Sequence, residues 1–359
     1  MLGGLKKVLA LQVRLFSGSV IAFLLSWFLS KHFANLKIVQ DTPGSGPQKV
    51  HPEKASRMGG IAIIVALVLA GLVVNLKDLL LLIFVSMPVV LIALYEDMFQ
   101  KVRPFIRLSV SFCTALIFSL VFKVYISYVD ISFIDLVLKI TFFGLAFTMF
   151  AVAGITNSFN IIDGLHGLAS GTGIIILGFY SLTAYLVRDF VVFSISLLAI
   201  FALLGFILNN YPSGKILLGD NGAYFLGFLI ATTSILLVYR NQGISPWYPL
   251  LCVAYPFTET IFSIYRRRFA KKKNAMDADF LHMHSLVFKR YVRNNAKTSS
   301  LFWAGSLLTC LLAFFFRSNT KVLIGLYLLY LVVYVVVYLR ITRFKNKKIN
   351  LFLSKRNSA

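Results

Sequence analysis

The sequence predicts an all-α integral membrane protein with about eleven transmembrane helices. Hydrophobic residues make up 58% of its 359 positions and charged residues only 14%, and the mean hydropathy is +0.83. This composition is too apolar for an ordinary soluble domain. The apolar residues also gather in runs of roughly 20 without interior charges, the length that a helix needs to cross a bilayer core. We therefore expect residues 1–359 to form a single polytopic membrane domain.

Eleven such runs follow one another along the chain. The first comes after Lys6, Lys7 and Arg14, but it is long and no small-residue cleavage site follows it, so we interpret it as a retained anchor and not as a signal peptide. All three cysteines fall inside apolar runs, which indicates neither a disulfide framework nor a cysteine metal site. The runs cover residues 15–33, 59–75, 79–95, 108–126, 137–155, 168–187, 190–208, 223–239, 246–265, 300–316 and 322–339.

The distribution of positive charge predicts the orientation. Of the 36 Lys and Arg residues, 26 fall on one side of the predicted helices and 10 on the other. Because positive residues collect in cytoplasmic loops, the N-terminus is expected outside and the C-terminus in the cytoplasm. The cytoplasmic segments are then residues 34–58, 96–107, 156–167, 209–222 and 266–299, with a basic tail at 340–359. Topology and attraction to lipid head groups account for the net charge of +23, so we expect no nucleic acid partner.

Acidic residues are few, and eight of the 13 lie in these cytoplasmic segments. Glu96 and Asp97 end the third predicted helix. Adjacent carboxylates at a lipid interface repel, so they persist most easily where a cation or basic side chains neutralise them. Lys101, Arg103 and Arg107 follow directly. The plain alternative is a charged helix end.

A second polar segment joins the fifth and sixth helices. Asn157, Asn160 and Asp163 recur every three residues, so a helical turn would place them on one face. Gly164 and Gly167 permit close approach of the backbone. A helix cap alone would explain Asp163 and Gly164 but not the two amides.

Two further cytoplasmic segments carry polar residues of other kinds. Asp220, in Gly219-Asp220-Asn221-Gly222, is suited either to cap a helix or to bind magnesium, which takes one or two protein carboxylates together with substrate phosphates. Residues 277–285 contain Asp277, Asp279 and the pair His282 and His284. No cysteine or third histidine lies near that pair, so zinc is not favoured, and hydrogen bonds to phosphate are the better interpretation.

Together these segments resemble the polyprenyl-phosphate N-acetylhexosamine-1-phosphate transferases, a superfamily that includes the phospho-N-acetylmuramoyl-pentapeptide transferases. The likeness covers nearly the whole chain, and six motifs follow in the family's order. They are Arg57-Met58-Gly59-Gly60, Glu96-Asp97, the N-x-x-N-x-x-D-G-x-x-G string from Asn157 to Gly167, Gly219-Asp220-Asn221-Gly222, Pro256 with Glu259-Thr260, and His282-x-His284.

The chain departs from the family pattern at four positions. Glu96 and Glu259 stand where the family has Asp, and His166 stands where many members have a second Asp, which puts one nucleotide contact in doubt. Ser285 follows His284 in place of a further histidine. The absence of a triple histidine favours the simple amino-sugar branch over the muramoyl-pentapeptide enzymes.

The resemblance implies a reaction between a UDP-N-acetyl amino sugar and polyprenyl phosphate that releases UMP. It also implies Mg²⁺, with Mn²⁺ as a substitute, at a cytoplasmic site of a bacterial inner membrane protein that initiates cell-envelope polysaccharide synthesis. The expected catalytic residues are Asp97, Glu96 and Asp163, with Asp97 acting on the lipid phosphate. The expected metal ligands are Asp220 and Asp163, and the expected substrate-binding residues are Asn157, Asn160, His282, His284, Arg57, Arg103 and Arg107.

A transporter or lipid flippase is the main alternative, because many helices and a carboxylate inside a membrane segment also fit a carrier. Transporters place polar groups near the bilayer midplane and often have two related halves. Here Glu259 lies about two helical turns from Arg266, and no internal repeat is visible. A structural scaffold would not explain carboxylates on the basic side. The sequence fixes neither the amino sugar nor the downstream polymer, and it leaves a homodimer open.

Overall fold

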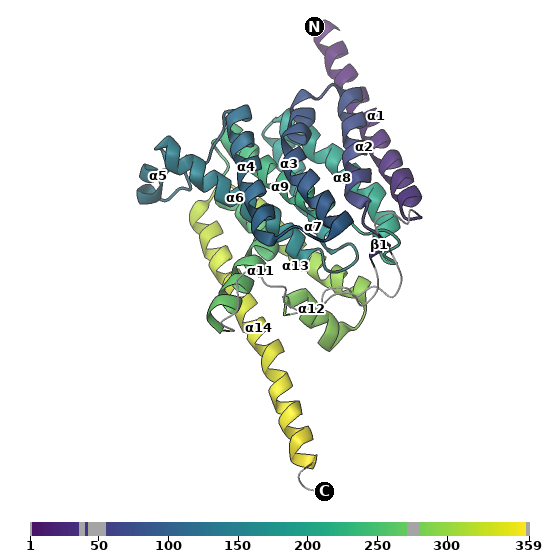
Figure 1. The fold of residues 1–359 in the computed structure, drawn as a ribbon. Helices are drawn as coiled ribbons and strands as arrows, with labels where there is room; N and C mark the ends of the chain where they lie inside the picture. The colour runs from purple at the N-terminus through teal and green to yellow at the C-terminus, as the bar shows by residue number, and fades with distance from the viewer. Residues whose placement is uncertain (1, 36–39, 42–54, 271–280, 357–359) are drawn as a thin grey trace.

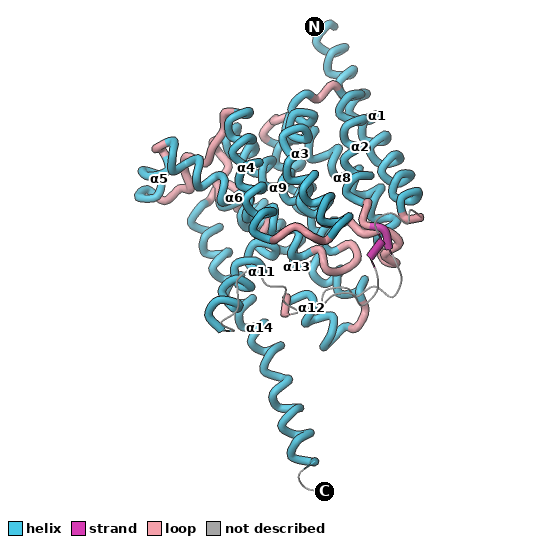
Figure 2. Tube along the Cα trace, in the orientation of Figure 1, coloured by secondary structure: helices cyan, strands magenta, loops and turns pink. Residues whose placement is uncertain are grey.

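The computed structural model describes residues 2–35, 40–41, 55–270 and 281–356 and shows a bundle of helices. The two ends of the described chain lie at opposite ends of the molecule (Figure 1). Figure 2 shows helix in almost every described segment and a single small pair of strands. The all-α prediction is therefore confirmed, while the orientation in the membrane remains a prediction.

The long helices follow the predicted order. Their bounds are α1 Leu2–Phe33, α2 Gly59–Val74, α3 Lys77–Phe99, α4 Pro104–Phe122, α6 Thr141–Ile162, α7 Leu168–Leu186, α8 Phe190–Asn210, α9 Gly219–Arg240, α13 Asn295–Phe315 and α14 Thr320–Arg356. Shorter helices are α5 Ser132–Leu138, α10 Trp247–Cys252, α11 Ala254–Tyr265 and α12 Met283–Val287, and two π-helical turns span Arg266–Ala270 and Phe288–Val292. The strands are β1 Gln40–Asp41 and β2 Ala55–Ser56.

Nine helices in the described part of the chain are long and apolar enough to cross a membrane. Of the two remaining predicted spans, α2 has 16 residues, and the ninth run is divided between α10 and α11 at Val253. A continuous helix over 246–265 is thus wrong. Pro256 has no N–H to donate to the carbonyl of Cys252, four residues earlier. The Cys310 thiol, whose Sγ lies 3.6 Å away, donates to that carbonyl instead.

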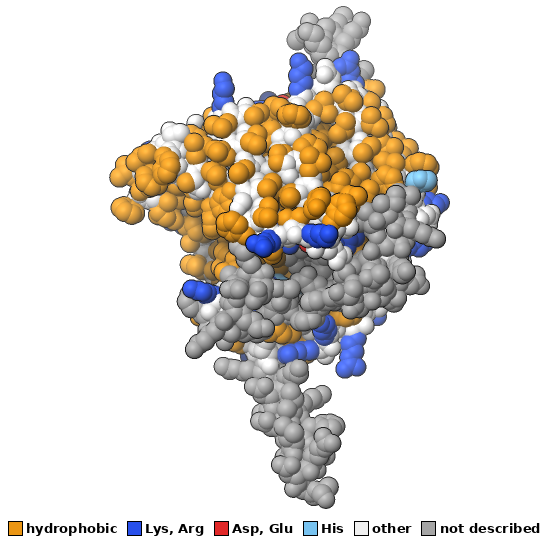
Figure 3. Space-filling view, in the orientation of Figure 1, with side chains coloured by type: hydrophobic (Ala, Val, Ile, Leu, Met, Phe, Trp, Pro, Cys, Tyr) orange, Lys and Arg blue, Asp and Glu red, His pale blue; other side chains and the backbone are white. Residues whose placement is uncertain are grey.

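Helix α9 forms the centre of the bundle. It contacts α2, α3, α6, α7 and α8, and 18 of its 22 residues are buried. A helix that is apolar on all sides is expected at such a position. Around it, hydrophobic side chains form a belt on the outer surface, with Lys and Arg side chains along both edges of the belt (Figure 3). This is the surface of a multi-pass membrane protein.

The N-terminus of α9 is held by the segment before α2. Strand β2 follows β1 in an antiparallel pair, and Ser56 forms a parallel bridge with Ile216. The next residues of the two segments then pair, since the N–H groups of Gly59 and Gly60 donate to the carbonyls of Leu217 and Leu218 at 3.1 and 2.9 Å. A Cβ on Gly60 would lie 2.3 Å from the Gly222 Cα atom, so only glycine allows this approach.

Candidate active site

Asp97 binds the N-terminus of α9. Its side chain, at the end of α3, is 0% exposed. Its Oδ1 accepts the backbone N–H of Asp220 at 3.0 Å, and its Oδ2 accepts the backbone N–H and the Nδ2 amide of Asn221 at 2.9 and 2.7 Å. The first N–H groups of a helix have no partner within the helix, and the helix dipole favours negative charge there. Asp97 therefore fixes the position of Asp220.

Arg57 lies on the other side of the Asp97 carboxylate. Its Nη1 is 3.5 Å from Asp97 Oδ1, and its carbonyl accepts the Asn221 side-chain amide at 3.0 Å. Gly219, with a φ of +77°, makes the turn into α9, and a Cβ there would lie 2.3 Å from that same carbonyl. The glycine in the Gly-Asp-Asn-Gly motif is thus required by the turn and by the contact.

Asp220, Arg107 and Glu96 form a second group beside the first. The Arg107 guanidinium of α4 pairs with the Asp220 carboxylate and lies 3.9 Å from Glu96 Oε1. The other Glu96 oxygen accepts the backbone N–H of Val102 at 2.7 Å and so holds the turn between α3 and α4. Side-chain exposure is 15% for Arg107, 17% for Glu96 and 23% for Asp220, so this group reaches the surface.

The Asn157–Asp163 segment lies on the last turns of α6 instead of a loop. Helix α6 continues to Ile162, so Asn157 and Asn160 share one face, as the spacing predicts. The Asn157 side-chain oxygen accepts the Tyr224 hydroxyl of α9 at 3.0 Å, and Asn160 also lies within hydrogen-bonding reach of that hydroxyl. The two amides thus face α9 one turn beyond Asp220.

Asp163 follows the last residue of α6. Burial, with the nearby carboxylates of Asp220 and Asp97, raises its pKa to about 8. Its side chain makes no hydrogen bond or ion pair with the residues that the structure describes. An unpaired carboxylate beside two others binds a proton or a cation readily. An added positive charge is therefore favourable at this side chain.

The histidines lie against the segment after α6. A Cβ on Gly164 would be 2.8 Å from His284 Nε2, so the glycine of the Asp-Gly pair lets this ring approach. Burial and the neighbouring His282 lower the pKa of His284 to about 3, so its ring is neutral. Tyr255 pairs with His284 Nδ1 at 2.8 Å, and Glu259 Oε1 is 2.9 Å from His282 Nδ1. Asp277 and Asp279 lie outside the described residues.

His166 links two interhelical connections through hydrogen bonds. Its Nδ1 is 3.0 Å from the Pro212 carbonyl, and its backbone N–H donates to Asn295 Oδ1 at 2.7 Å. Burial lowers the pKa of this histidine, so the ring is neutral at physiological pH. His166 therefore joins the α6–α7 connection to the α8–α9 connection.

Three features of the site differ from the sequence-based picture. Arg103 is exposed, and its side chain makes no hydrogen bond or ion pair with the described residues, so it lies apart from the pairs above. Tyr224 and Asn221 were not predicted, although both lie within four residues of Asp220 and face the predicted Asp97 and Asn157. Glu259 was noted for its motif but not as a site residue. A carboxylate inside an apolar membrane helix is a feature that indicates a functional residue.

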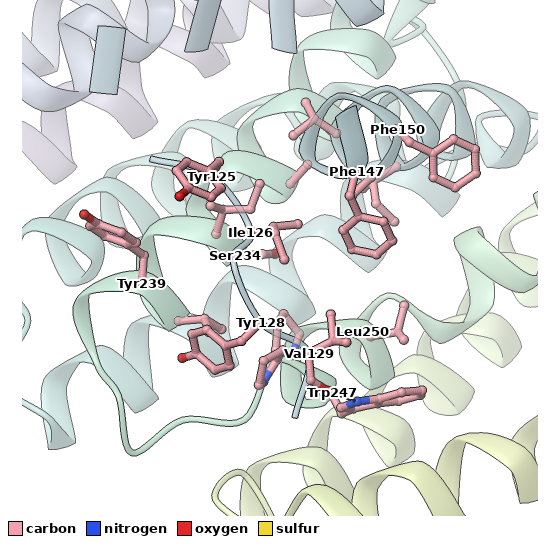
Figure 4. A pocket seen from close by; sticks show the side chains of 18 of the residues that line it. Tyr125, Ile126, Tyr128, Val129, Phe147, Phe150, Ser234, Tyr239, Trp247 and Leu250 are labelled. Atoms are coloured by element: carbon pink, nitrogen blue, oxygen red, sulfur yellow. Dashed lines mark hydrogen bonds between the residues drawn. The ribbon is translucent and has the colours of Figure 1, made fainter. Parts of the chain in front are cut away.

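An apolar cavity of about 390 Å³ lies farther along the same helices. Figure 4 shows aromatic rings around it, including Tyr125, Phe147, Phe150 and Trp247. The Trp247 indole N–H donates to the Val129 carbonyl at 2.8 Å, which leaves the ring as apolar lining. Its other walls come from the 125–131 connection, α9, α10 and α11. Helix α6 thus lines the cavity with residues 147–155 and carries Asn157 and Asn160 on its last turns, with Asp163 directly after its end.

Comparison with known proteins identifies the family. The sequence model of glycosyl transferase family 4 matches residues 79–238. A Bacillus subtilis protein named probable undecaprenyl-phosphate N-acetylglucosaminyl 1-phosphate transferase is 30% identical over 249 residues, which cover 67% of this chain and 68% of that protein. The undecaprenyl-phosphate alpha-N-acetylglucosaminyl 1-phosphate transferase of Thermotoga maritima is 29% identical over 76% of this chain and 80% of its own.

The muramoyl-pentapeptide branch is also similar. The phospho-N-acetylmuramoyl-pentapeptide-transferase of Staphylococcus carnosus is 28% identical, over 82% of this chain and 96% of its own. On these matches, and with the family's motifs brought to one end of a membrane bundle, the chain belongs to the polyprenyl-phosphate hexosamine-1-phosphate transferase family.

Proposed function

We propose that this enzyme transfers an N-acetylated amino-sugar 1-phosphate from a UDP-sugar to polyprenyl phosphate at the cytoplasmic face of a bacterial membrane. An oxygen of the lipid phosphate attacks the β-phosphorus of the UDP-sugar, and the bond between that phosphorus and the bridging oxygen breaks. UMP leaves, and a polyprenyl-diphospho-sugar remains in the membrane, where it would initiate the synthesis of an envelope polysaccharide.

One observation carries the proposal: carboxylates and arginines from four distant segments meet around the N-terminus of α9. Such phosphoryl transfer depends mainly on positioning and on neutralising charge, because two phosphates must approach each other. Arg57 and Arg107 supply positive charge beside Asp97 and Asp220. Relatives named for the acceptor undecaprenyl phosphate support a lipid phosphate as the nucleophile.

The residues present suit Mg²⁺. No group of three or more His, Cys, Asp or Glu side chains in the described segments could hold a metal. Magnesium does not need one, since it keeps several waters and binds one or two carboxylates with substrate phosphates. Asp163 and Asp220 would be those carboxylates, and the unpaired state and raised pKa of Asp163 fit a position beside a cation. When bound, the ion would offset repulsion between the phosphates.

A transfer assay tests the proposal directly. Purified protein is incubated with polyprenyl phosphate and a panel of labelled UDP-N-acetyl amino sugars, with and without magnesium. We expect label in the lipid phase together with UMP in the aqueous phase, for one preferred sugar. Absence of a lipid-linked product from every sugar in the panel would contradict the proposed function.

The cavity yields a prediction about the acceptor. Because α6 connects the cavity to the polar site, we propose that it holds part of the polyprenyl chain. Ala151→Trp should fill the cavity and raise the KM for long-chain polyprenyl phosphate by about tenfold, a loss of roughly 1.4 kcal/mol of binding free energy, while the KM for the UDP-sugar stays unchanged.

Steady-state kinetics with a long-chain and a short-chain acceptor measure this effect. Val332→Trp is the matched control, because Val332 is 60% exposed on α14 and does not line the cavity. An equal rise in KM for both acceptors would show that the cavity does not hold the distal chain.

A further inference from the structure

Glu259 is a buried carboxylate to which the proposed chemistry gives no role. It lies inside α11 with 0% exposure and accepts four hydrogen bonds. The donors are Ser263 Oγ at 3.1 Å, His282 Nδ1 at 2.9 Å, the Met283 backbone N–H at 3.0 Å and the Tyr334 hydroxyl at 2.7 Å. The donors come from α11 itself, from the segment entering α12, and from α14. A charge buried in a membrane bundle is costly unless hydrogen-bond donors surround it. A carboxylate at such a position therefore indicates a functional role.

The partners of His282 define its tautomer. A carboxylate only accepts hydrogen bonds, so Nδ1 carries the proton that faces Glu259. On the opposite side of the ring, Nε2 is 3.3 Å from Arg267 Nη2. Because a guanidinium only donates, Nε2 must present its lone pair. The ring is thus a neutral bridge between a buried carboxylate and the arginine.

The same network joins the final helix to the histidine segment. Tyr338, one turn after Tyr334 on α14, donates to the Leu281 carbonyl at 3.2 Å, and Arg266 donates to that carbonyl at 2.7 Å. The His282 and His284 rings are parallel within 7°, with centroids 5.6 Å apart. His284 in turn lies against Gly164, next to Asp163. A shift of His282 would therefore reach Asp163, which we propose as a magnesium ligand.

We infer that Glu259 is a positioning residue of this active site. Through Nδ1 it fixes the tautomer of His282, and through that ring it holds the Arg267 guanidinium and residues 281–284 against the segment that follows α6. The inference rests on the proposed function where it concerns the UDP-sugar, because we place the phosphates of that donor at the magnesium ion that Asp163 would hold. The tautomer and its control by Glu259 do not depend on the substrate.

Histidine ¹⁵N NMR of the full chain in detergent tests the tautomer without any substrate. The protein has five histidines, and the His282→Asn variant identifies the His282 resonances. In the wild type we expect a neutral ring protonated at Nδ1. In Glu259→Gln we expect the Nε2–H tautomer to appear beside the Nδ1–H form, because the amide can donate to Nδ1 and only the long contact of 3.3 Å between Nε2 and Arg267 Nη2 then opposes that tautomer. An unchanged Nδ1–H tautomer in this variant overturns the inference.

Kinetics test the consequence for the site. Glu259→Gln should raise the KM for the UDP-sugar by about 10-fold to 100-fold, the range seen when a residue that orients a metal-binding histidine is lost, with the KM for the lipid acceptor unchanged. A purely structural role would lower the fraction of folded enzyme and leave both KM values as they are. The double variant Glu259→Gln/His282→Asn should be no worse than His282→Asn, because Glu259 acts through that ring. Additive losses would refute this route.

Tyr334→Phe provides a milder test if Glu259→Gln does not fold. It removes one donor from the carboxylate, so the His282 Nδ1–H bond should strengthen and its proton resonance should move downfield. Tyr330→Phe is the matched control, because Tyr330 lies one turn earlier on α14 and its hydroxyl makes no hydrogen bond with the described residues. Equal shifts in the two variants would contradict the inference. Failure of wild-type transfer would instead overturn the proposed function and leave the NMR result to decide on Glu259.

Discussion

Replacing Asp220 by alanine is expected to reduce magnesium-dependent transfer by about 10²-fold to 10³-fold, the usual effect of losing one group that stabilises charge in a transition state. Asp220 is the second residue of α9, and its carboxylate is 23% exposed beside Arg107. The change removes a proposed metal ligand and alters the position of a guanidinium that neutralises phosphate. Product formation at saturating substrates, across a range of magnesium concentrations, measures the loss.

The fold should survive this substitution. Asp97 still accepts the backbone N–H at position 220, and Arg107 still has Glu96 Oε1 at 3.9 Å. A partly exposed ion pair contributes about 0–1 kcal/mol, so the melting temperature should change by only a few degrees.

Asp189→Ala is the matched control. Asp189 also lies at a helix N-terminus and pairs with an arginine, Arg240 Nε at 2.8 Å, but at the opposite end of α9. It should lower stability and leave the activity per folded molecule unchanged. Near-normal turnover in Asp220→Ala, or an equal loss of activity in the control, would remove Asp220 from the site.

The sequence predicts the helices of this protein well because a bilayer imposes one length and one composition on every crossing. All eleven apolar runs overlap helices, although the fifth begins at the end of α5 and crosses the break before α6, and the ninth is interrupted at Val253. Pro256 is visible in the sequence, but its effect depends on whether another donor satisfies the carbonyl that it leaves free. The donor is Cys310, 58 residues from Cys252, and no local pattern indicates that pairing.

The residues of the site can also be predicted from the sequence, but their hydrogen-bond partners cannot. A repeat of three residues indicated that Asn157 and Asn160 share a helical face, and α6 confirms it. No local pattern indicates the partners, because Asp97 lies 123 and 124 positions from Asp220 and Asn221, whose backbone N–H groups it accepts. A motif shows which residues belong to a site, but not which are bound to other protein groups and which are left for substrate. That distinction separates Asp97 from Asp163.

The two acids should respond differently to the same isosteric change. Asn at position 97 would place an NH₂ group against one of the N–H donors of α9, leaving a buried donor without its acceptor. Such a loss costs about 1–3 kcal/mol, so Asp97→Asn should lower the melting temperature, and by displacing Asp220 it should also lower turnover. Asp163→Asn replaces a half-buried side chain that makes no hydrogen bond or ion pair with the described residues, so stability should be retained while binding of magnesium and UDP-sugar is weakened.

The pH dependence of binding provides a second criterion. Because the pKa of Asp163 is raised to about 8, this carboxyl holds a proton at neutral pH, and a cation must displace that proton to bind. Magnesium affinity in the wild type should therefore rise as the pH increases through about 8 and level off above it. In Asp163→Asn the affinity should be low and should lack this rise, since no carboxyl remains at that position to titrate.

Calorimetric titration of magnesium and UDP-sugar, beside melting curves and turnover on detergent-purified variants, separates the roles. If Asp97 instead acts directly on the lipid phosphate, as its motif predicts, Asp97→Asn should suppress turnover with its melting temperature and its UDP-sugar affinity intact. An interaction made only with the nucleophile in the transition state lowers kcat alone, whereas one that holds the nucleotide or its metal already contributes to binding in the ground state. Equal losses of magnesium and UDP-sugar affinity in both variants would contradict separate roles for Asp97 and Asp163. A drop in melting temperature confined to Asp97→Asn would establish that this carboxylate acts by holding α9 in place.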